Sequence, residues 1–367
     1  MGLDDPCAEH EDLQARNFII ACYAVSLVHG ETIRYIPIRY ATLKGYIAQA
    51  LECHTQRKLI SPKEAEIDYI KIITSAVQKY EKMPNRREMI YDSMYHHMIK
   101  LRSRYSESHP DCLVVALCDW MFLGRYVGFR KSEWCNDHKT AYTKIDDPEW
   151  GSRPDALSLI KEDIQFFSST GAPVTLPEAA LLTRDLPEAI AYVELLIRKQ
   201  KNNDNYQTLK YNRCTKNSAL CPVLAAFRIV CRATHLNLPD EHPVAIYRDS
   251  TTKERRQITG RECNMFLRQV ASTVFKIPLN SPALKKWSTH SVRVTAANLL
   301  HRARFSDSYI KNRLRWRSNT FLMYLRNTFY TADDHTKALD IGISPQQPSD
   351  FRPAEYHETF IAELTEA

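Results

Sequence analysis

Apolar and polar residues alternate along the chain mainly with helical spacing. In four segments of the first hundred residues, apolar positions recur at intervals of three and four, which favours a packed helical bundle. The segments read "EDLQARNFIIACYAVSLV", "YATLKGYIAQALECHTQ", "SPKEAEIDYIKIITSAVQKY" and "NRREMIYDSMYHHMIKLRSRY". The third begins with a Ser-Pro-x-Glu start signal at Ser61, which predicts that a helix starts there.

The rest of the chain mixes helices with a few strands. A strongly apolar helix, "CLVVALCDWMFLGRYVGFRKSEW", ends in a basic turn. Two segments of strand character, 156–169 and 189–200, are separated by turns that contain Pro and Gly. "HPVAIY" reads as a short strand or an extended segment, and helices are predicted at 221–235, 259–275, 288–306 and 306–316. We therefore predict a mainly α chain with a small β-sheet, of the α+β class.

The length of 367 residues suggests two or three domains. The polar segment 104–111 contains a Pro and is the candidate linker. It gives a helical domain over 1–105 and a mixed α/β domain over 106–330. The remaining residues, 331–367, are polar and Pro-rich in the middle, and we interpret them as a segment that is either mobile or dependent on a partner for its structure.

Composition agrees with a helical, soluble protein. Glycine accounts for only 9 of 367 residues, well below the average of about 7%. The ten cysteines show no C-x-x-C and no Cys/His spacing of the zinc type, so we expect free thiols and no metal. There is no secretory signal, and the longest apolar run, "FIIACYAVSLV", is too short to span a bilayer. The sequence predicts an intracellular protein.

Positive charge is concentrated near the C-terminal end. The whole chain has a net charge of +7, but residues 285–326 carry ten basic side chains and one acid, Asp307, for a local net charge of +9. Such a block in folded sequence suggests a polyanionic partner, most often nucleic acid; the alternative is a solvated helical face. The candidate DNA-binding residues are Lys285, Lys286, Arg302, Arg313, Arg315 and Arg317.

Several residues that could act on a phosphate follow one another in a suggestive order. "GFRKSE" supplies Arg130 and, three residues later, Glu133. "THSVR" supplies His290 and Arg293, which lie on the same side of a helix because they are three residues apart. Between these motifs, a lysine lies at a predicted hairpin tip, and a tryptophan and a tyrosine follow in "LRWRSNTFLMYLRN"; these residues are Lys199 or Lys201, Trp316 and Tyr324.

This order resembles the tyrosine recombinase (phage integrase-like) family. That family's pattern is an arginine in G-[LF]-R-x-x-E, a hairpin lysine, H-x-x-R, His or Trp, and then a tyrosine. The match runs from about 111 to 330, and the first hundred residues fit the family's helical core-binding domain. "THSVRV", the Trp and "FLMYLRN" are most similar to the Cre enzyme and to recombinases of DIRS-type retroelements, which are mobile elements.

The resemblance implies a role for each of these residues. Tyr324 would be the nucleophile that forms a 3′-phosphotyrosine with one DNA strand. Arg130 and Arg293 would clamp the phosphate, since guanidinium presents a rigid fork of donors to its oxygens. Lys201 would protonate the leaving oxygen, with Lys199 as the alternative. The three remaining residues are assigned by the same comparison: His290 contacts the phosphate or accepts a proton, Trp316 holds an oxygen or packs, and Glu133 orients a neighbouring group.

The resemblance also implies a site-specific DNA recombinase or integrase that requires no cofactor, metal or ATP. Its partners would be double-stranded DNA and three further copies of the chain, as a homotetramer on two sites with 331–367 docking on a neighbour. It would work where the DNA is, in a nucleus or a bacterial cytoplasm. A type IB topoisomerase and a catalytically silent DNA-binding relative are the alternatives.

One spacing departs from the pattern. Trp316 and Tyr324 are eight residues apart, whereas phage-type members have nine, so the role of Trp316 is less certain than that of Tyr324. Tyr309 and Tyr330 are the alternative nucleophiles, but neither lies in the "FLMYLRN" frame.

Overall fold

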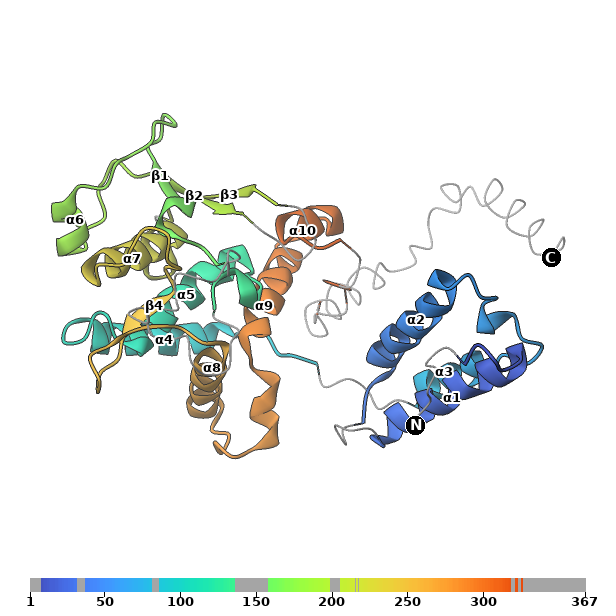
Figure 1. Ribbon diagram of the computed structural model, residues 1–367. Helices are drawn as coiled ribbons and strands as arrows, with labels where there is room; N and C mark the ends of the chain where they lie inside the picture. The colour runs from blue at the N-terminus through green and yellow to red at the C-terminus, as the bar shows by residue number, and fades with distance from the viewer. Residues whose placement is uncertain are drawn as a thin grey trace, which may run out of the picture. The chain divides into compact units, whose positions relative to one another are not determined.

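The computed structural model describes residues 8–31, 37–80, 86–135, 158–198, 205–214, 216, 218–317, 321–322 and 325. The chain forms two compact units, Met1–Asn85 and Arg86–Ala367, and Figure 1 shows the elements of each. Tyr324, Lys199, Lys201, Tyr330 and the segment 331–367 lie outside the described residues.

The first unit is a set of three helices around a small apolar core. They are α1 (Leu13–His29), α2 (Tyr40–Gln56) and α3 (Tyr69–Tyr80). Leu43 and Ile70 are buried at its centre, and Asn17 of α1 binds the turn before α3 by donating to the carbonyl oxygen of Pro62 at 2.8 Å. The predicted helix start at Ser61 is wrong: Ser61 caps the short 3-10 turn η1 (Pro62–Glu64), and α3 begins only at Tyr69.

The fourth predicted helix, α4 (Asp92–Ser106), belongs to the second unit. Its buried residues Met94, Tyr95 and Met98 join the large core of that unit. The division between the units therefore falls at 85 and 86, whereas the sequence suggests 105 and 106. The polar segment 104–111 is the connection between α4 and α5 within one unit, because the apolar face of α4 packs against α5.

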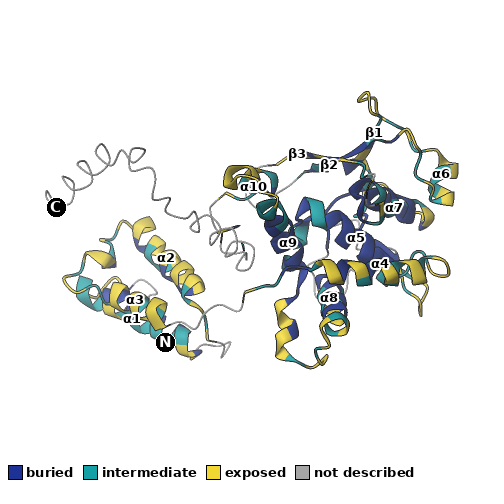
Figure 2. Ribbon diagram, turned by 180° about the vertical axis from the view of Figure 1, so that it is seen from behind, coloured by how far each residue is buried: buried dark blue, intermediate teal, exposed yellow. Residues whose placement is uncertain are grey.

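The second unit is built around α5 (Leu113–Val127), which packs against α4, α7 (Pro222–His235), α8 (Gly260–Phe275) and α9 (Thr289–Arg302). Figure 2 shows α5 buried along its length between these helices. The short helices α6 (Glu178–Thr183) and α10 (Asp307–Arg313) pack against α7 and α9 respectively. The 3-10 turns among the described residues of this unit are η2 (Lys131–Glu133), η4 (Lys161–Asp163), η5 (Ser218–Leu220) and η6 (Pro282–Lys286).

Two small antiparallel sheets complete the unit. The larger has the order β1 (Ile164–Phe167), β2 (Tyr192–Ile197) and β3 (Gln207–Asn212), and the smaller pairs β4 (Ile246–Arg248) with β5 (Arg255–Gln257). The two predicted strands contain β1 and β2 but are longer than both, and β3 was not predicted. Ile197 pairs with Gln207, so β2 and β3 form an antiparallel pair; Lys199 and Lys201 lie between these strands in the sequence and outside the described residues. The prediction of a mainly α chain with a small sheet is confirmed.

Gly124 allows α5 and α9 to approach each other closely. A Cβ atom at Gly124 would lie 2.6 Å from Cγ1 of Val292 on α9, well inside van der Waals contact. This close approach matters for the site described next, because α5 ends just before Arg130 and α9 carries Arg293.

Candidate active site

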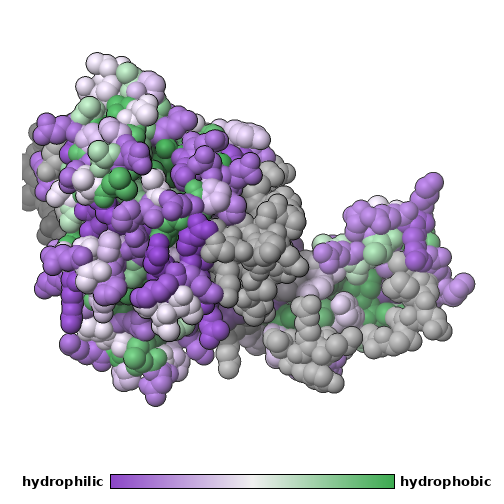
Figure 3. Space-filling view, turned by 60° about the vertical axis from the view of Figure 1, so that its left-hand side comes forward, coloured by the Kyte–Doolittle hydropathy of each residue, from purple (hydrophilic) through white to green (hydrophobic). Residues whose placement is uncertain are grey.

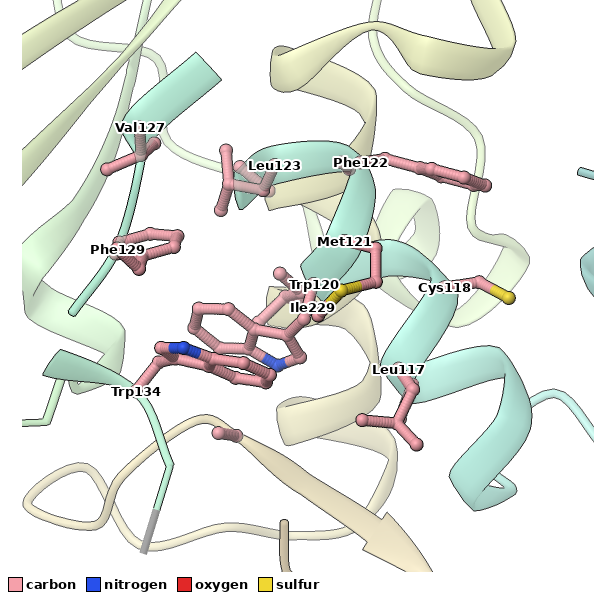
Figure 4. Packing of buried hydrophobic residues seen from close by; sticks show 14 of the residues in the cluster. Leu117, Cys118, Trp120, Met121, Phe122, Leu123, Val127, Phe129, Trp134 and Ile229 are labelled. Carbon is pink, nitrogen blue, oxygen red and sulfur yellow. The ribbon is translucent and has the colours of Figure 1, made fainter. Parts of the chain in front are cut away.

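The turn that carries Arg130 and Glu133 is anchored at both ends by aromatic packing. Phe129 precedes the turn and Trp134 follows it, and both pack on Trp120 of α5 (Figure 4). The rings of Trp120 and Trp134 are stacked with centroids 5.0 Å apart, and the Trp120–Phe129 distance is 5.5 Å. Since all three rings are buried, the position of the turn is set by the core.

Within this turn, Glu133 binds Arg130 twice. Its carboxylate accepts from the backbone N–H of Arg130 at 2.9 Å and from Nη1 of the same residue at 3.2 Å. The side chain of Arg130 is 16% exposed and that of Glu133 only 2%. Glu133 therefore closes the first turn of η2 and orients the guanidinium that lies closer to the surface.

Helix α9, which packs against α5, supplies Arg293. At the start of this helix the hydroxyl oxygen of Ser291 accepts from the backbone N–H of Ser288 at 3.1 Å, which stabilises its first turn. Arg293 is 3% exposed. Its Nη1 donates to the carbonyl oxygen of Gly128 at 3.0 Å, and its Nη2 donates to that of Leu314. Arg293 thus joins the end of α5 to the end of α10.

Arg130 and Arg293 meet at one carbonyl oxygen, that of Arg315. Nη2 of Arg130 donates to it, and Nη2 of Arg293 lies 3.3 Å from it. The backbone of Arg315 is left-handed, with φ of 59°, an uncommon conformation for a residue other than glycine. Both guanidinium groups thus lie at one point of the fold, and a guanidinium presents a rigid fork of donors that suits the oxygens of a phosphate.

The side chain of Arg315 turns inward to Glu133. Its Nη2 lies 2.6 Å from the carboxylate, and the two side chains are 1% and 2% exposed. Burial raises the pKa of Glu133, but the cations Arg315, Arg293 and Arg130 outweigh it and lower that pKa below its ordinary value. Three guanidinium groups and one carboxylate give this cluster a net charge of +2.

Trp316 packs against Arg293. The guanidinium carbon of Arg293 lies 4.4 Å from the centre of the Trp316 ring, a cation–π contact. The structure therefore brings Trp316 to the arginine pair, as a packing partner of one of them.

His290 lies one turn before Arg293 on α9. Burial, Arg293 and Arg87 together lower the pKa of His290 to about 4. The imidazole is consequently neutral at pH 7.

The predicted DNA-binding residues fall into two groups. Lys285, Lys286 and Arg317 are exposed. Arg315 is buried in the cluster described above, and Arg313 is half-buried: it donates to the carbonyl oxygen of Lys210 on β3 and lies over the ring of Tyr211. Arg302 is also half-buried. The linear sequence treats these six residues alike, whereas the fold turns Arg313 and Arg315 toward the protein.

Figure 3 shows one face of the second unit on which hydrophilic side chains predominate. Among the described residues there is no group of three His, Cys, Asp or Glu side chains that could hold a metal ion. No helix in the same part of the chain is long and apolar enough to cross a bilayer. The nine described cysteines carry free thiols.

The structure thus brings together Arg130, Glu133, Arg293 and Trp316, with His290 adjacent. The sequence missed the inward role of Arg315, because in "RLRWR" every second residue is basic and nothing in the pattern separates the buried arginine from its neighbours. Lys201 and Tyr324 stay predictions.

No family model and no curated protein matches the chain. Similar solved structures are DNA-bound integrases and recombinases. The Tn1549 transposon integrase in complex with transposon right end DNA is 12% identical and covers 88% of this chain and 85% of its own, with a TM-score of 0.48. The XerH site-specific recombinase bound to palindromic difH substrate is 14% identical, with 88% and 70% covered and a TM-score of 0.47.

A lambda integrase dimer bound to a core site is 11% identical, with 89% of this chain and 83% of that chain covered and a TM-score of 0.43. All of these identities are low and the TM-scores are below 0.5.

Proposed function

We propose that this chain is a tyrosine-type, site-specific DNA recombinase or integrase. The observation that carries the proposal is the meeting of Arg130 and Arg293 at one point, 163 positions apart in the sequence, in a cluster with a net charge of +2. A phosphodiester carries one negative charge and gains a second as a nucleophile adds to phosphorus. A fixed charge of +2 suits that state better than the ground state, which is the condition for catalysis.

The chemistry would be two successive transesterifications. The Tyr324 oxygen attacks phosphorus, the bond to the 5′-oxygen breaks, and a 3′-phosphotyrosine forms. The 5′-hydroxyl of another strand then reverses the step and releases Tyr324. The phosphoester bond is conserved throughout, so the exchange needs no ATP.

Two groups would move the protons. Neutral His290 accepts the proton of Tyr324, and Lys201, on the connection between β2 and β3, gives one to the leaving 5′-oxygen; Lys199 is the alternative. General acid–base catalysis of this kind typically raises the reaction rate roughly 10²–10⁴-fold. Trp316 would contribute by packing against Arg293, and Glu133 would contribute by orienting Arg130.

Double-stranded DNA is the proposed partner, with Lys285, Lys286 and Arg317 on phosphates beyond the reacting one. We also propose that four copies act on two DNA sites, with 331–367 docking on a neighbouring copy. The proposed place of action is wherever the DNA is, a nucleus or a bacterial cytoplasm, and a mobile element is the proposed source.

Two related functions share much of this site. A type IB topoisomerase would use the same cations and tyrosine but would relax supercoils without joining two sites. A silent DNA-binding relative would bind without cleavage. Relaxation of a supercoiled plasmid with no recombinant product would favour the first, and binding with no covalent adduct the second.

Covalent capture on nicked duplex DNA tests the proposal. A library of random duplexes, each with a nick that lets the leaving strand diffuse away, would trap the protein on its target sequence. The wild-type chain should form a DNA adduct that resists denaturation. Tyr324→Phe should bind the selected duplex but form no adduct, while Tyr309→Phe and Tyr330→Phe should still form it; an adduct with Tyr324→Phe would contradict the assignment.

A further inference from the structure

Both the side chain and the backbone carbonyl of Arg315 contact the charged cluster. Its guanidinium lies 2.6 Å from the buried carboxylate of Glu133, and its Nη1 donates to the carbonyl oxygen of Val127 at 3.4 Å. Its own carbonyl oxygen accepts from Arg130 and Arg293. One residue thus contacts the carboxylate and both arginines of the cluster.

The backbone conformation makes this double use possible. The left-handed φ of 59° at Arg315 follows the end of α10, where the chain reverses before Trp316. Left-handed geometry at a residue with a Cβ costs roughly 1–2 kcal/mol, so surrounding contacts must hold it. The side chain of Arg315 supplies two of these contacts, to Glu133 and Val127. Arg130 and Arg293 supply the others by binding its carbonyl oxygen.

The charges show what the side chain contributes. Glu133 is 2% exposed and negatively charged, and it forms ion pairs with both Arg315 and Arg130, of which the contact to Arg315 is the shorter. Without Arg315, the negative charge of Glu133 would offset the positive charge of Arg130, which is the more exposed of the two arginines proposed to bind the phosphate. With Arg315 present, the cluster keeps a surplus of two positive charges.

We propose that Arg315 is a positioning residue of the active site: its side chain neutralises Glu133, and its carbonyl oxygen sets the separation of Arg130 and Arg293, so that both arginines remain available to the reacting phosphate. This inference rests on the proposed function for its catalytic consequence. Its structural half, the coupling of Arg315 to Glu133, holds independently of any reaction and can be measured without DNA.

Charge restoration provides the first test. Arg315→Gln should lower the rate of covalent adduct formation roughly 10²–10³-fold, the loss typical of one electrostatic group, with little change in DNA binding. Glu133→Gln combined with Arg315→Gln returns the cluster to +2 and should recover about tenfold of that loss, since neighbouring charges couple strongly. The rate of adduct formation of Arg315→Lys should lie between those of wild type and Arg315→Gln. A double variant that folds but is no faster than Arg315→Gln would overturn the proposal.

The pH dependence of stability provides the second test, on protein alone. In wild type the pKa of Glu133 is lowered, and Arg315 is the largest of the charges that lower it; without Arg315 this pKa should rise. The charged carboxylate then destabilises the variant as pH rises, so its deficit in Tm should be larger at pH 8 than at pH 4.5. This pH dependence should vanish in the Glu133→Gln background, and an equal deficit at both pH values would overturn the proposal.

The control is Arg104→Gln, which removes an exposed arginine from the end of α4. It should change neither the adduct rate nor the pH dependence of Tm. If the wild-type chain forms no adduct on any duplex while the Tm coupling appears, the proposed reaction fails and the positioning role of Arg315 in the cluster stands. If adducts form but the pH dependence of Tm does not differ between wild type and Arg315→Gln, the proposed reaction stands and the positioning role of Arg315 fails.

Discussion

The guanidinium carbon of Arg293 lies 4.4 Å from the ring centre of Trp316. Trp316 is also packed near Phe321, with ring centroids 6.5 Å apart. An aromatic face therefore limits one side of Arg293, while carbonyl oxygens of Gly128 and Leu314 hold its nitrogen atoms. Together these contacts leave Arg293 little freedom to move away from a phosphate.

We therefore expect Trp316 to support adduct formation by packing its ring against Arg293, and not by a hydrogen bond from its indole N–H. Trp316→Phe keeps a ring beneath Arg293 and should retain adduct formation within about tenfold of wild type, whereas Trp316→Ala should lose more, since cation–π contacts contribute about 0.5–2 kcal/mol and the cavity adds to the loss. Single-turnover capture on nicked duplex measures both. Equal losses for Phe and Ala would instead indicate that the indole N–H is required.

The two arginines should matter for cleavage far more than for binding. Arg293→Ala and Arg130→Ala each remove one cation of the +2 cluster, so the adduct rate should fall by roughly 10²-fold or more, while the Kd for duplex DNA changes little. The matched comparison is Lys285→Ala, on an exposed residue: it should weaken binding and reduce the salt dependence of the Kd, but leave the rate at saturating protein unchanged. If Arg293→Ala lost rate and binding equally, the arginines would only position DNA.

The sequence predicted the parts of this protein that follow from local pattern. Helices with clear three-and-four spacing, such as α7 and α8, lie where they were expected, and "GFRKSE" and "THSVR" do converge in the fold. β3, "QTLKYN", was missed, because its alternating burial is carried by only two apolar residues, Leu209 and Tyr211. Its pairing with β2 is a tertiary effect.

The assignment of α4 and of Arg315 needed the three-dimensional structure for the same reason. The apolar positions of α4 follow the same spacing as those of the three helices before it. The sequence pattern therefore does not show that α4 packs against α5 instead of against those helices. Arg315 and Arg317 are equally basic and two residues apart, yet one is buried on Glu133 and the other is exposed. Burial of a charge depends on a counter-charge 182 positions away, which no local pattern contains.

His290 should make the second unit less stable in mild acid. Its pKa is about 4 in the folded chain and about 6.5 when unfolded. Between these values the unfolded state binds a proton and the folded state does not, so stability is full above pH 6.5 and falls as pH drops toward 4, by up to about 3 kcal/mol. His290→Gln should remove this component.

Tryptophan fluorescence measures that loss in the second unit alone, because all five tryptophans of the chain follow residue 86. Urea unfolding at pH 7 and at pH 5 should show a larger drop for wild type than for His290→Gln. The variant His96→Gln changes an exposed histidine on α4 and should keep the wild-type drop. Identical behaviour of all three proteins would mean that His290 is protonated normally in the folded state.

Gly124→Ala should separate α5 from α9 and disturb the site without touching any of its residues. The added Cβ would lie 2.6 Å from Cγ1 of Val292, and both helices are buried here, so the overlap is relieved only by moving one of them. Overpacking of this kind costs typically 1–3 kcal/mol. Because Arg130 follows α5 and Arg293 lies on α9, the adduct rate should fall along with Tm.

Gly45→Ala is the matched control for that variant. Gly45 lies in α2, and a Cβ there would meet no atom within 4 Å. The same substitution should therefore raise helix stability by about 0.5–1 kcal/mol and leave the adduct rate unchanged. Calorimetric unfolding of both variants, compared with capture on nicked DNA, distinguishes the helix contact from a general effect of replacing glycine. If Gly124→Ala unfolded and reacted like wild type, close packing of α5 on α9 would not be what holds the two arginines together.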